Sequence, residues 1–131
     1  MIRRLKFWCS ESGASAAEFA MIIPVFSALT LGVINLCFLM YFNAQLHFTV
    51  DEAARCMSVN PANVTNSCAT GPSTQTHAAA NFNYPSLSPS FSAVSATCGD
   101  KVTGTATYTL NAIVISKSVP LTATACFPIQ D

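Results

Sequence analysis

One uninterrupted apolar run dominates the hydropathy pattern of the chain. Residues 19–42 read FAMIIPVFSALTLGVINLCFLMYF; 19 of these 24 residues are apolar, and no charged residue occurs in residues 19–50. About 20 apolar helical residues are enough to cross the hydrocarbon core of a bilayer. The core helix of a soluble protein is the competing interpretation, but such a helix normally keeps a polar face, which this run lacks. The pattern therefore predicts a membrane-spanning helix.

The helix is expected to continue beyond the run as an amphipathic segment. Apolar residues recur there at helical spacing, with polar and charged residues on the other faces: Leu46, Val50, Ala53 and Met57. Such spacing indicates one buried helix face. Because proline disfavours helix in the residue before it, the segment should end near Pro61. We thus predict that residues 14–42 span the membrane and that residues 43–60 extend the same helix outside it.

From residue 91 onward the hydrophobic period changes to two, which is typical of strands. The alternation is clear in residues 102–110 and 121–127 and weaker in residues 91–98. We expect a small antiparallel sheet with a threonine-rich outer face and an apolar face packed on the long helix. A short helix is expected near residues 74–82. The fold class is therefore α+β, with residues 61–131 forming a small domain after the helix.

The charge balance argues against a protein that binds nucleic acid electrostatically. Six Lys and Arg residues balance six Asp and Glu residues, and charged residues make up only 9% of the chain. Only three cations lie beyond position 6, namely Arg55, Lys101 and Lys117. Neutralising a phosphate backbone needs a denser basic surface than this.

Cations lie on the N-terminal side of the apolar run. Arg3, Arg4 and Lys6 precede it, whereas the first charges after it are acidic, so the positive-inside rule places the N-terminus in the cytoplasm. A secretory signal peptide is the main alternative. Its apolar core would hold roughly 7–15 residues and begin soon after the cations. Here the polar residues 9–18 intervene and the run is longer. We expect a single-pass protein with its C-terminal domain outside the cytoplasm.

The junction before the run carries the most specific motif in the chain. Residues 13–24 read GASAAEFAMIIP: a glycine, small residues, the carboxylate of Glu18 and then the apolar helix. This segment resembles a type IV prepilin-like signal and, more narrowly, the TadE family of the Tad (Flp) pilus assembly system. The resemblance implies that a prepilin peptidase cuts between Gly13 and Ala14 and removes residues 1–13, the basic leader.

Three residues of the predicted helix have specific interpretations. The resemblance implies that Glu18 pairs with the new α-amino group of the same or a neighbouring subunit. The alternative is that Glu18 lies at headgroup depth near a helix N-terminus, where the macrodipole favours an anion. Pro24 should bend or loosen the helix by removing one backbone hydrogen bond. Asn35 either bonds a neighbouring helix or is satisfied within its own helix or by a local water.

The resemblance implies a structural role in pilus assembly, as a pseudopilin or minor pilin with a pilin-like fold in the bacterial inner membrane. The expected partners are the prepilin peptidase, other pilins or pseudopilins, the Tad assembly platform and membrane lipid. The protein would enter the fibre or its tip, or act in the periplasm. The alternatives are a pseudopilin of a type II secretion apparatus, and an uncleaved, membrane-anchored binding module of the envelope. The small residues after Gly13 and the proline at position 24 favour the TadE-like interpretation.

Six cysteines divide between the predicted compartments. Cys9 lies in the leader and Cys37 in the run, which leaves four outside the membrane. Four cysteines allow three pairings. We favour Cys56–Cys68, closing a short loop off the long helix, and Cys98–Cys126, joining two strands. A zinc site is the competing interpretation, but the cysteines are widely spaced and no C-x-x-C pair occurs.

The sequence offers no motif for catalysis. It contains no nucleophile elbow, phosphate-binding loop or paired acid–base cluster, and neither His47 nor His77 has an evident partner. The carboxylates beyond the run, Asp100 among them, are expected to be exposed. We therefore expect a protein without enzymatic activity, metal or cofactor.

Overall fold

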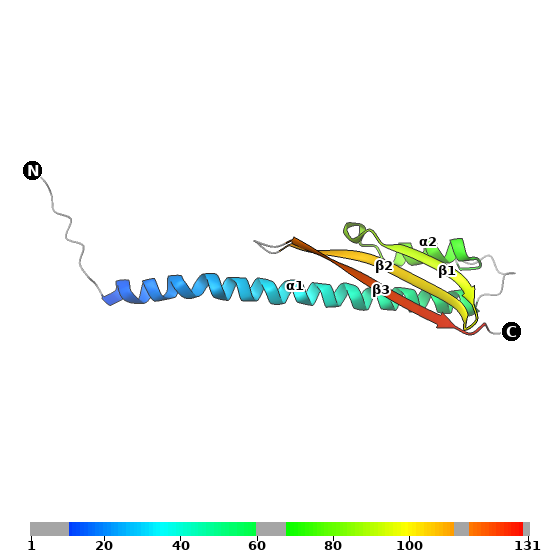
Figure 1. The fold of residues 1–131 in the computed structure, drawn as a ribbon, viewed down its shortest axis with the longest axis horizontal. Coiled ribbons are helices and arrows are strands. Elements are labelled where there is room, and N and C mark those ends of the chain that lie inside the picture. Colours follow the sequence, from blue (N-terminus) through cyan, green and yellow to red (C-terminus); the bar gives the residue numbers. More distant parts are fainter. Residues whose placement is uncertain (1–10, 60–67, 112–115, 130–131) are drawn as a thin grey trace, which may run out of the picture. The chain divides into compact units, whose positions relative to one another are not determined.

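The computed structural model describes residues 11–59, 68–111 and 116–129. The elements in chain order are α1 (Glu11–Val59), α2 (Gly71–Asn81), the short 3-10 helix η1 (Pro85–Leu87), β1 (Ser90–Ala96), β2 (Gly99–Asn111) and β3 (Ser116–Phe127) (Figure 1). The expected α+β fold, with a long apolar N-terminal helix and a small antiparallel sheet, is confirmed. The chain forms two compact units, which divide between Leu36 and Cys37. We call them the N-terminal unit and the sheet unit.

Helix α1 begins earlier than the pattern predicts. It starts at Glu11 rather than Ala14, and it ends at Val59, close to the predicted end. Alanine is the strongest helix former and an acidic residue is favoured in the first turn, so the helix extends back through Gly13. Pro24 lies inside α1 and does not end it. Proline removes one backbone hydrogen bond, and this 49-residue helix continues on both sides of it.

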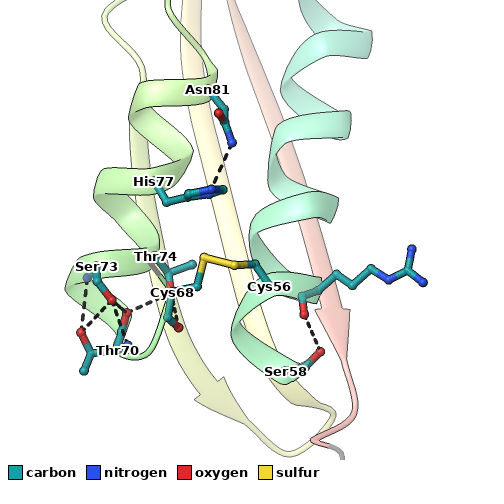
Figure 2. Close-up of a disulfide and its surroundings, with 9 residues drawn as sticks. Cys56, Ser58, Cys68, Thr70, Ser73, Thr74, His77 and Asn81 are labelled. Atoms are coloured by element: carbon teal, nitrogen blue, oxygen red, sulfur yellow. Dashed lines mark hydrogen bonds between the residues drawn. A yellow bond between two sulfur atoms is a disulfide. The ribbon is translucent and has the colours of Figure 1, made fainter. Parts of the chain in front are cut away.

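The part of α1 in the sheet unit has one buried face. Leu46, Val50 and Ala53 are buried as their spacing predicts, and Met57 is half-buried. Ala54, which follows the same stripe, is also buried. These side chains join one hydrophobic core with residues of α2 and all three strands. Figure 2 shows α1 and α2 side by side over the sheet, so the sheet unit has two layers.

The sheet is antiparallel with the strand order β1-β2-β3, so β2 is central. Inward-facing pairs between β2 and β3 are Val102–Ala125, Gly104–Ala123 and Ala106–Leu121. The residues between them form outward-facing pairs, of which Thr103–Thr124 and Thr105–Thr122 are examples. The predicted apolar inner face and threonine-rich outer face therefore both exist.

Both β2 and β3 are longer than predicted. Strand β3 begins at Ser116 rather than Leu121, and β2 begins at Gly99 rather than Val102. The additional residues, including Pro120, do not alternate in the way the pattern requires. They become strand because each pairs with a residue of a neighbouring strand: Gly99 pairs with Ala96 of β1, and the others pair across the β2–β3 ladder. Pro120 is tolerated because β3 is an edge strand.

Helix α2 begins three residues earlier than its predicted start at Thr74. The reason is a capping box in which Thr70 accepts a hydrogen bond from the Ser73 backbone, while the Ser73 hydroxyl binds the Thr70 backbone. Pro72, in the first turn, needs no hydrogen-bond partner there. The helix ends at Asn81, and Phe82 immediately after it is fully buried in the core.

Candidate functional site

Large apolar side chains cover the surface of α1 between Phe19 and Leu36. Eleven large apolar side chains between Phe19 and Leu36 are exposed, with Met21 77% and Val25 69% accessible. Removing each such side chain from water is worth roughly 1.5–3 kcal/mol. Within the described parts of the chain, α1 is the one helix that is long and apolar enough to cross a membrane.

Two polar side chains of this apolar stretch, Thr30 and Asn35, are hydrogen-bonded within α1. The Thr30 hydroxyl donates to the carbonyl oxygens of Phe26 and Ser27, both at 3.0 Å. The Asn35 amide donates to the Leu31 carbonyl oxygen at 2.9 Å. Of the two interpretations of Asn35, the structure therefore contains the intrahelical bond. The amide nitrogen has one further hydrogen to donate, since a side-chain amide carries two.

The predicted processing residues lie in the first turns of α1. Gly13 is exposed, and a β-carbon added to it would meet no atom within 4 Å. Its neighbour Ala14 is also helical, and Glu18 is exposed. Five residues correspond to about 7.5 Å along a helix axis, so Glu18 is near the end that cleavage after Gly13 would create. Residues 1–10 of the predicted leader, with Cys9, lie outside the described residues.

Two disulfides join the elements of the sheet unit, with the pairing favoured from the sequence. Cys56–Cys68 links the end of α1 to the turn before α2, with a Cα–Cα distance of 5.8 Å (Figure 2). Cys98–Cys126 links the β1–β2 turn to the end of β3, with a Cα–Cα distance of 6.2 Å. The fifth described cysteine, Cys37, is an exposed free thiol.

The surroundings of Cys56–Cys68 are tightly hydrogen-bonded. Cys68 is fully buried, and its carbonyl oxygen accepts a bond from the buried Thr74 hydroxyl at 3.2 Å. The same hydroxyl also approaches the Thr70 carbonyl oxygen at 2.9 Å. The first turn of α2 is thereby held against the disulfide, as Figure 2 shows. This disulfide thus fixes the position of α2 relative to the last turns of α1.

His77 has neighbours that the sequence analysis did not find. Its Nδ1 lies 3.4 Å from the Asn81 side-chain nitrogen, one helical turn later. One ring nitrogen and the sulfur atoms of Cys56 and Cys68 all lie within 4.8 Å of one another. Three such atoms would suit a thiophilic metal, but thiolates are needed as ligands and both sulfurs are committed to the disulfide. The spacing of His77 and Asn81 was the available signal, since helical residues four apart are neighbours.

The expectation of an exposed Asp100 was wrong. Asp100 is only 6% accessible, and its Oδ1 accepts a hydrogen bond of 2.8 Å from the Ser95 hydroxyl. The two residues are opposite each other in the β1–β2 register. A buried carboxylate needs hydrogen-bond donors, and the register supplies one. This arrangement explains the burial of Asp100 as part of the hairpin structure.

A cluster of aromatic side chains, also missed from the sequence, lies where α1 enters the sheet unit. Phe42 is central, with ring centroids 5.1 Å from Tyr84 and 5.4 Å from Tyr108. The hydroxyl oxygens of Tyr41 and Tyr84 lie 2.8 Å apart. This hydrogen bond raises the pKa of Tyr84, and desolvation and charge repulsion between the two tyrosine hydroxyl oxygens raise it further. No local pattern could have found the cluster, because its members come from three separate segments.

The helix and its first turns can be compared with known families. Residues 13–55 match the family model described as TadE-like protein. The chain is TadE-like over this segment. The match begins at Gly13 and ends just before Cys56, so it covers the apolar run and most of the amphipathic extension, about a third of the chain. The resemblance stated from the sequence is thereby confirmed, and it indicates a protein related to the Tad pilus. The comparisons with curated proteins and with solved structures gave no match.

Proposed function

We propose that the chain is a pseudopilin or minor pilin that takes part in assembling a Tad (Flp) pilus after processing by a prepilin peptidase. The observation that carries this proposal is the position of the TadE-like match, which begins at Gly13. Gly13 is the residue after which the sequence motif predicts the cut. The match then continues through the apolar helix that processing would leave in place.

The proposed role is structural rather than enzymatic. Before assembly, α1 would anchor the protein in the inner membrane, with the N-terminus in the cytoplasm and the sheet unit in the periplasm. The basic residues Arg3, Arg4 and Lys6 support that orientation. During assembly, the exposed apolar surface of α1 would pack against the helices of other pilins or pseudopilins. The assembly platform and peptidase would be separate proteins.

Cleavage would leave Glu18 close to a new positive charge. Removing residues 1–13 gives a 118-residue product whose first residue, Ala14, carries a free α-amino group. A carboxylate in a membrane span costs roughly 2.5–3.5 kcal/mol on insertion scales, so a nearby ammonium group would offset part of that cost. We propose that this pairing, within one subunit or between neighbours, favours docking of the processed helix.

The helical conformation of Gly13 adds a requirement to this mechanism. A peptidase needs an extended backbone at the cut, whereas the structure has Gly13 inside the first turn of α1. Glycine within a helix is less stable than alanine by roughly 0.5–1 kcal/mol. We therefore propose that the first turn unwinds in the peptidase active site and that Gly13 lowers the free energy needed for this.

Intact mass and N-terminal sequencing of the membrane-extracted protein, with and without the peptidase, test the proposal. We expect a chain beginning at Ala14 when the peptidase is present and at Met1 when it is absent. Gly13→Ala should slow processing, and a larger residue at position 13 should abolish it. Gly32→Ala is the matched control, because Gly32 is also helical and also has no atom within 4 Å of an added β-carbon.

Other results would favour the alternatives. A chain that keeps Met1 in the presence of the peptidase would indicate the uncleaved, membrane-anchored binding module. A chain that is cut but cross-links to secretion pseudopilins rather than to Tad pilins would indicate the type II secretion apparatus. The TadE-like match favours the Tad pilus over both.

A further inference from the structure

The aromatic cluster occupies one end of the sheet unit. Its members come from α1, from the segment after α2 and from β2: Phe38, Tyr41, Phe42, Tyr84 and Tyr108. The apolar run ends at Phe42, inside this cluster. A membrane that takes up the run would therefore place these rings at its surface.

The cluster is both exposed and amphipathic. Phe38 and Tyr41 are 52% and 47% accessible, although their neighbours in the core are buried. The Tyr41–Tyr84 hydroxyl pair is also exposed. The bond between the two hydroxyls uses one of their two hydrogens, so the other can be donated to a further acceptor. Rings with an apolar body and a polar tip are enriched at the boundary between lipid and water. The cluster has the chemistry of that boundary.

A groove of about 500 Å³ opens beside the cluster. Its walls are the side chains of Phe38, Phe42, Leu87 and Tyr108, and Ser86 and Thr107 contribute hydroxyl groups. The groove lining contains no charged residue. Apolar walls with neighbouring hydroxyl groups suit an amphipathic ligand, which is hydrocarbon at one end and polar at the other.

One cation lies at the same end of the sheet unit. Lys117 is exposed and pairs with Leu110, two residues beyond Tyr108 on β2. Lys101 pairs with Cys126 at the opposite end of the same ladder. Lysine beside a membrane surface is attracted to the phosphates of anionic lipids. Charge complementarity therefore favours a phospholipid over an uncharged partner at the aromatic end.

We propose that the aromatic cluster and its groove form a phospholipid-binding site, so that this end of the sheet unit lies in the interfacial layer of the bilayer. Acyl chains near the glycerol contact Phe38 and Phe42, the Tyr41–Tyr84 pair donates its remaining hydroxyl hydrogen to a headgroup oxygen, and Lys117 faces a phosphate. This inference rests on the proposed anchoring of α1 in a membrane. It adds that the sheet unit itself binds lipid.

Tryptophan reporters test the phospholipid-binding site in vesicles of phosphatidylethanolamine and phosphatidylglycerol. The natural Trp8 is replaced by phenylalanine in every variant. The reporter is Tyr84→Trp, whose indole N–H can still donate to Tyr41. The matched control is Val94→Trp, because Val94 is 53% accessible and lies opposite Lys101, at the other end of the sheet. Phe26→Trp reports separately on whether the apolar run is in the membrane.

Lipids brominated near the glycerol should quench the Tyr84→Trp reporter strongly and shift its emission to the blue. Val94→Trp should keep its intensity, and Phe26→Trp should be quenched by lipids brominated near mid-chain. Adding Lys117→Glu should reduce the quenching of Tyr84→Trp, whereas Lys101→Glu should leave it unchanged. Mass measurement of both disulfides confirms that each variant has folded.

Three results would contradict the proposed phospholipid-binding site. Quenching of Phe26→Trp but not of Tyr84→Trp would leave the anchor intact and refute lipid binding by the sheet unit. Absence of quenching at both positions would refute the anchor as well. The third result is a blue shift of Tyr84→Trp emission without quenching by brominated lipid. If that shift grows with the ratio of protein to lipid, a second copy of the chain occupies the groove instead.

Discussion

Gly104 of β2 lies directly against Val50 of α1. A β-carbon on Gly104 would come within 2.7 Å of Val50 Cγ2, 2.9 Å of Phe91 Cε1 and 3.1 Å of Leu46 Cδ1. Real β-carbons do not approach other atoms this closely, so the absence of a side chain at position 104 permits the observed packing of helix on sheet. The sheet unit depends on this contact, because Leu46 and Val50 are both fully buried in its core.

Gly104→Ala should destabilise the sheet unit by roughly 1–3 kcal/mol, the usual effect of overpacking a well-packed core. Chemical unfolding of the purified chain in detergent, followed by near-UV circular dichroism, measures the change. Thr105→Ala on the outer face of the same strand is the control and should change stability by about 0.5 kcal/mol or less. The double variant Val50→Ala/Gly104→Ala should lose less stability than the sum of the single variants. Strict additivity would contradict the contact.

Thiol alkylation should report both the number of disulfides and whether the leader has been removed. In the processed chain Cys9 is gone, so one thiol, Cys37, should react before reduction and five after it. An unprocessed chain would react at two and six positions. Mass spectrometry of the alkylated protein gives these numbers. More than two reactive thiols in the unreduced protein would contradict the disulfides.

The two disulfides should also differ in their effect on stability. Replacing either pair by serine should lower the free energy of unfolding by roughly 2–4 kcal/mol. Cys98–Cys126 closes a loop of sequence separation 28 and Cys56–Cys68 one of 12, so loss of the former should be the more destabilising. Urea unfolding of the two double-serine variants under non-reducing conditions provides the comparison. The reverse order would mean that lost packing near Cys68 outweighs loop entropy.

Tyr41→Phe should lower the pKa of Tyr84. The hydrogen bond with Tyr41 is the largest cause of the raised value, so its removal should bring the Tyr84 pKa back toward the ordinary value of about 10. Carbon NMR of ring-labelled tyrosine follows the titration. Tyr108→Phe is the control and should leave the pKa of Tyr84 raised.

The same pair makes stability depend on pH in one direction. Because the folded-state pKa of Tyr84 is above the unfolded value, its contribution is fully present below about pH 10 and is lost as pH rises through the folded-state pKa. The wild-type chain should therefore lose stability above pH 10 more steeply than Tyr41→Phe. Parallel pH profiles for the two proteins would contradict this linkage.

Glu18→Gln should impair pilus assembly more than membrane insertion. The amide keeps the shape of the side chain but cannot form an ion pair with the α-amino group of processed Ala14. Counting pili and measuring the amount of protein in the membrane fraction separate the two effects. Glu11→Gln is the control, since residue 11 would be removed with the leader. Normal piliation in Glu18→Gln would contradict the proposed pairing.

The sequence by itself determined the elements whose evidence is local. The apolar run predicted α1, the stripe of Leu46, Val50 and Ala53 predicted its buried face, and the motif at Gly13 predicted the TadE-like match. The alternation around Val102 predicted which face of the sheet is apolar. Each of these signals depends on the spacing of residues within one segment, which a single chain displays directly.

Only the tertiary structure decided the features that depend on contacts between segments. Strand β3 extends through Pro120 because β2 supplies partners for it, and Asp100 is buried because the β1–β2 register places Ser95 opposite. The closeness of Gly104 to Val50, and of Tyr41 to Tyr84, brings together residues more than forty positions apart. Such contacts are set by the packing of helices on the sheet, and spacing within a segment carries no information about them.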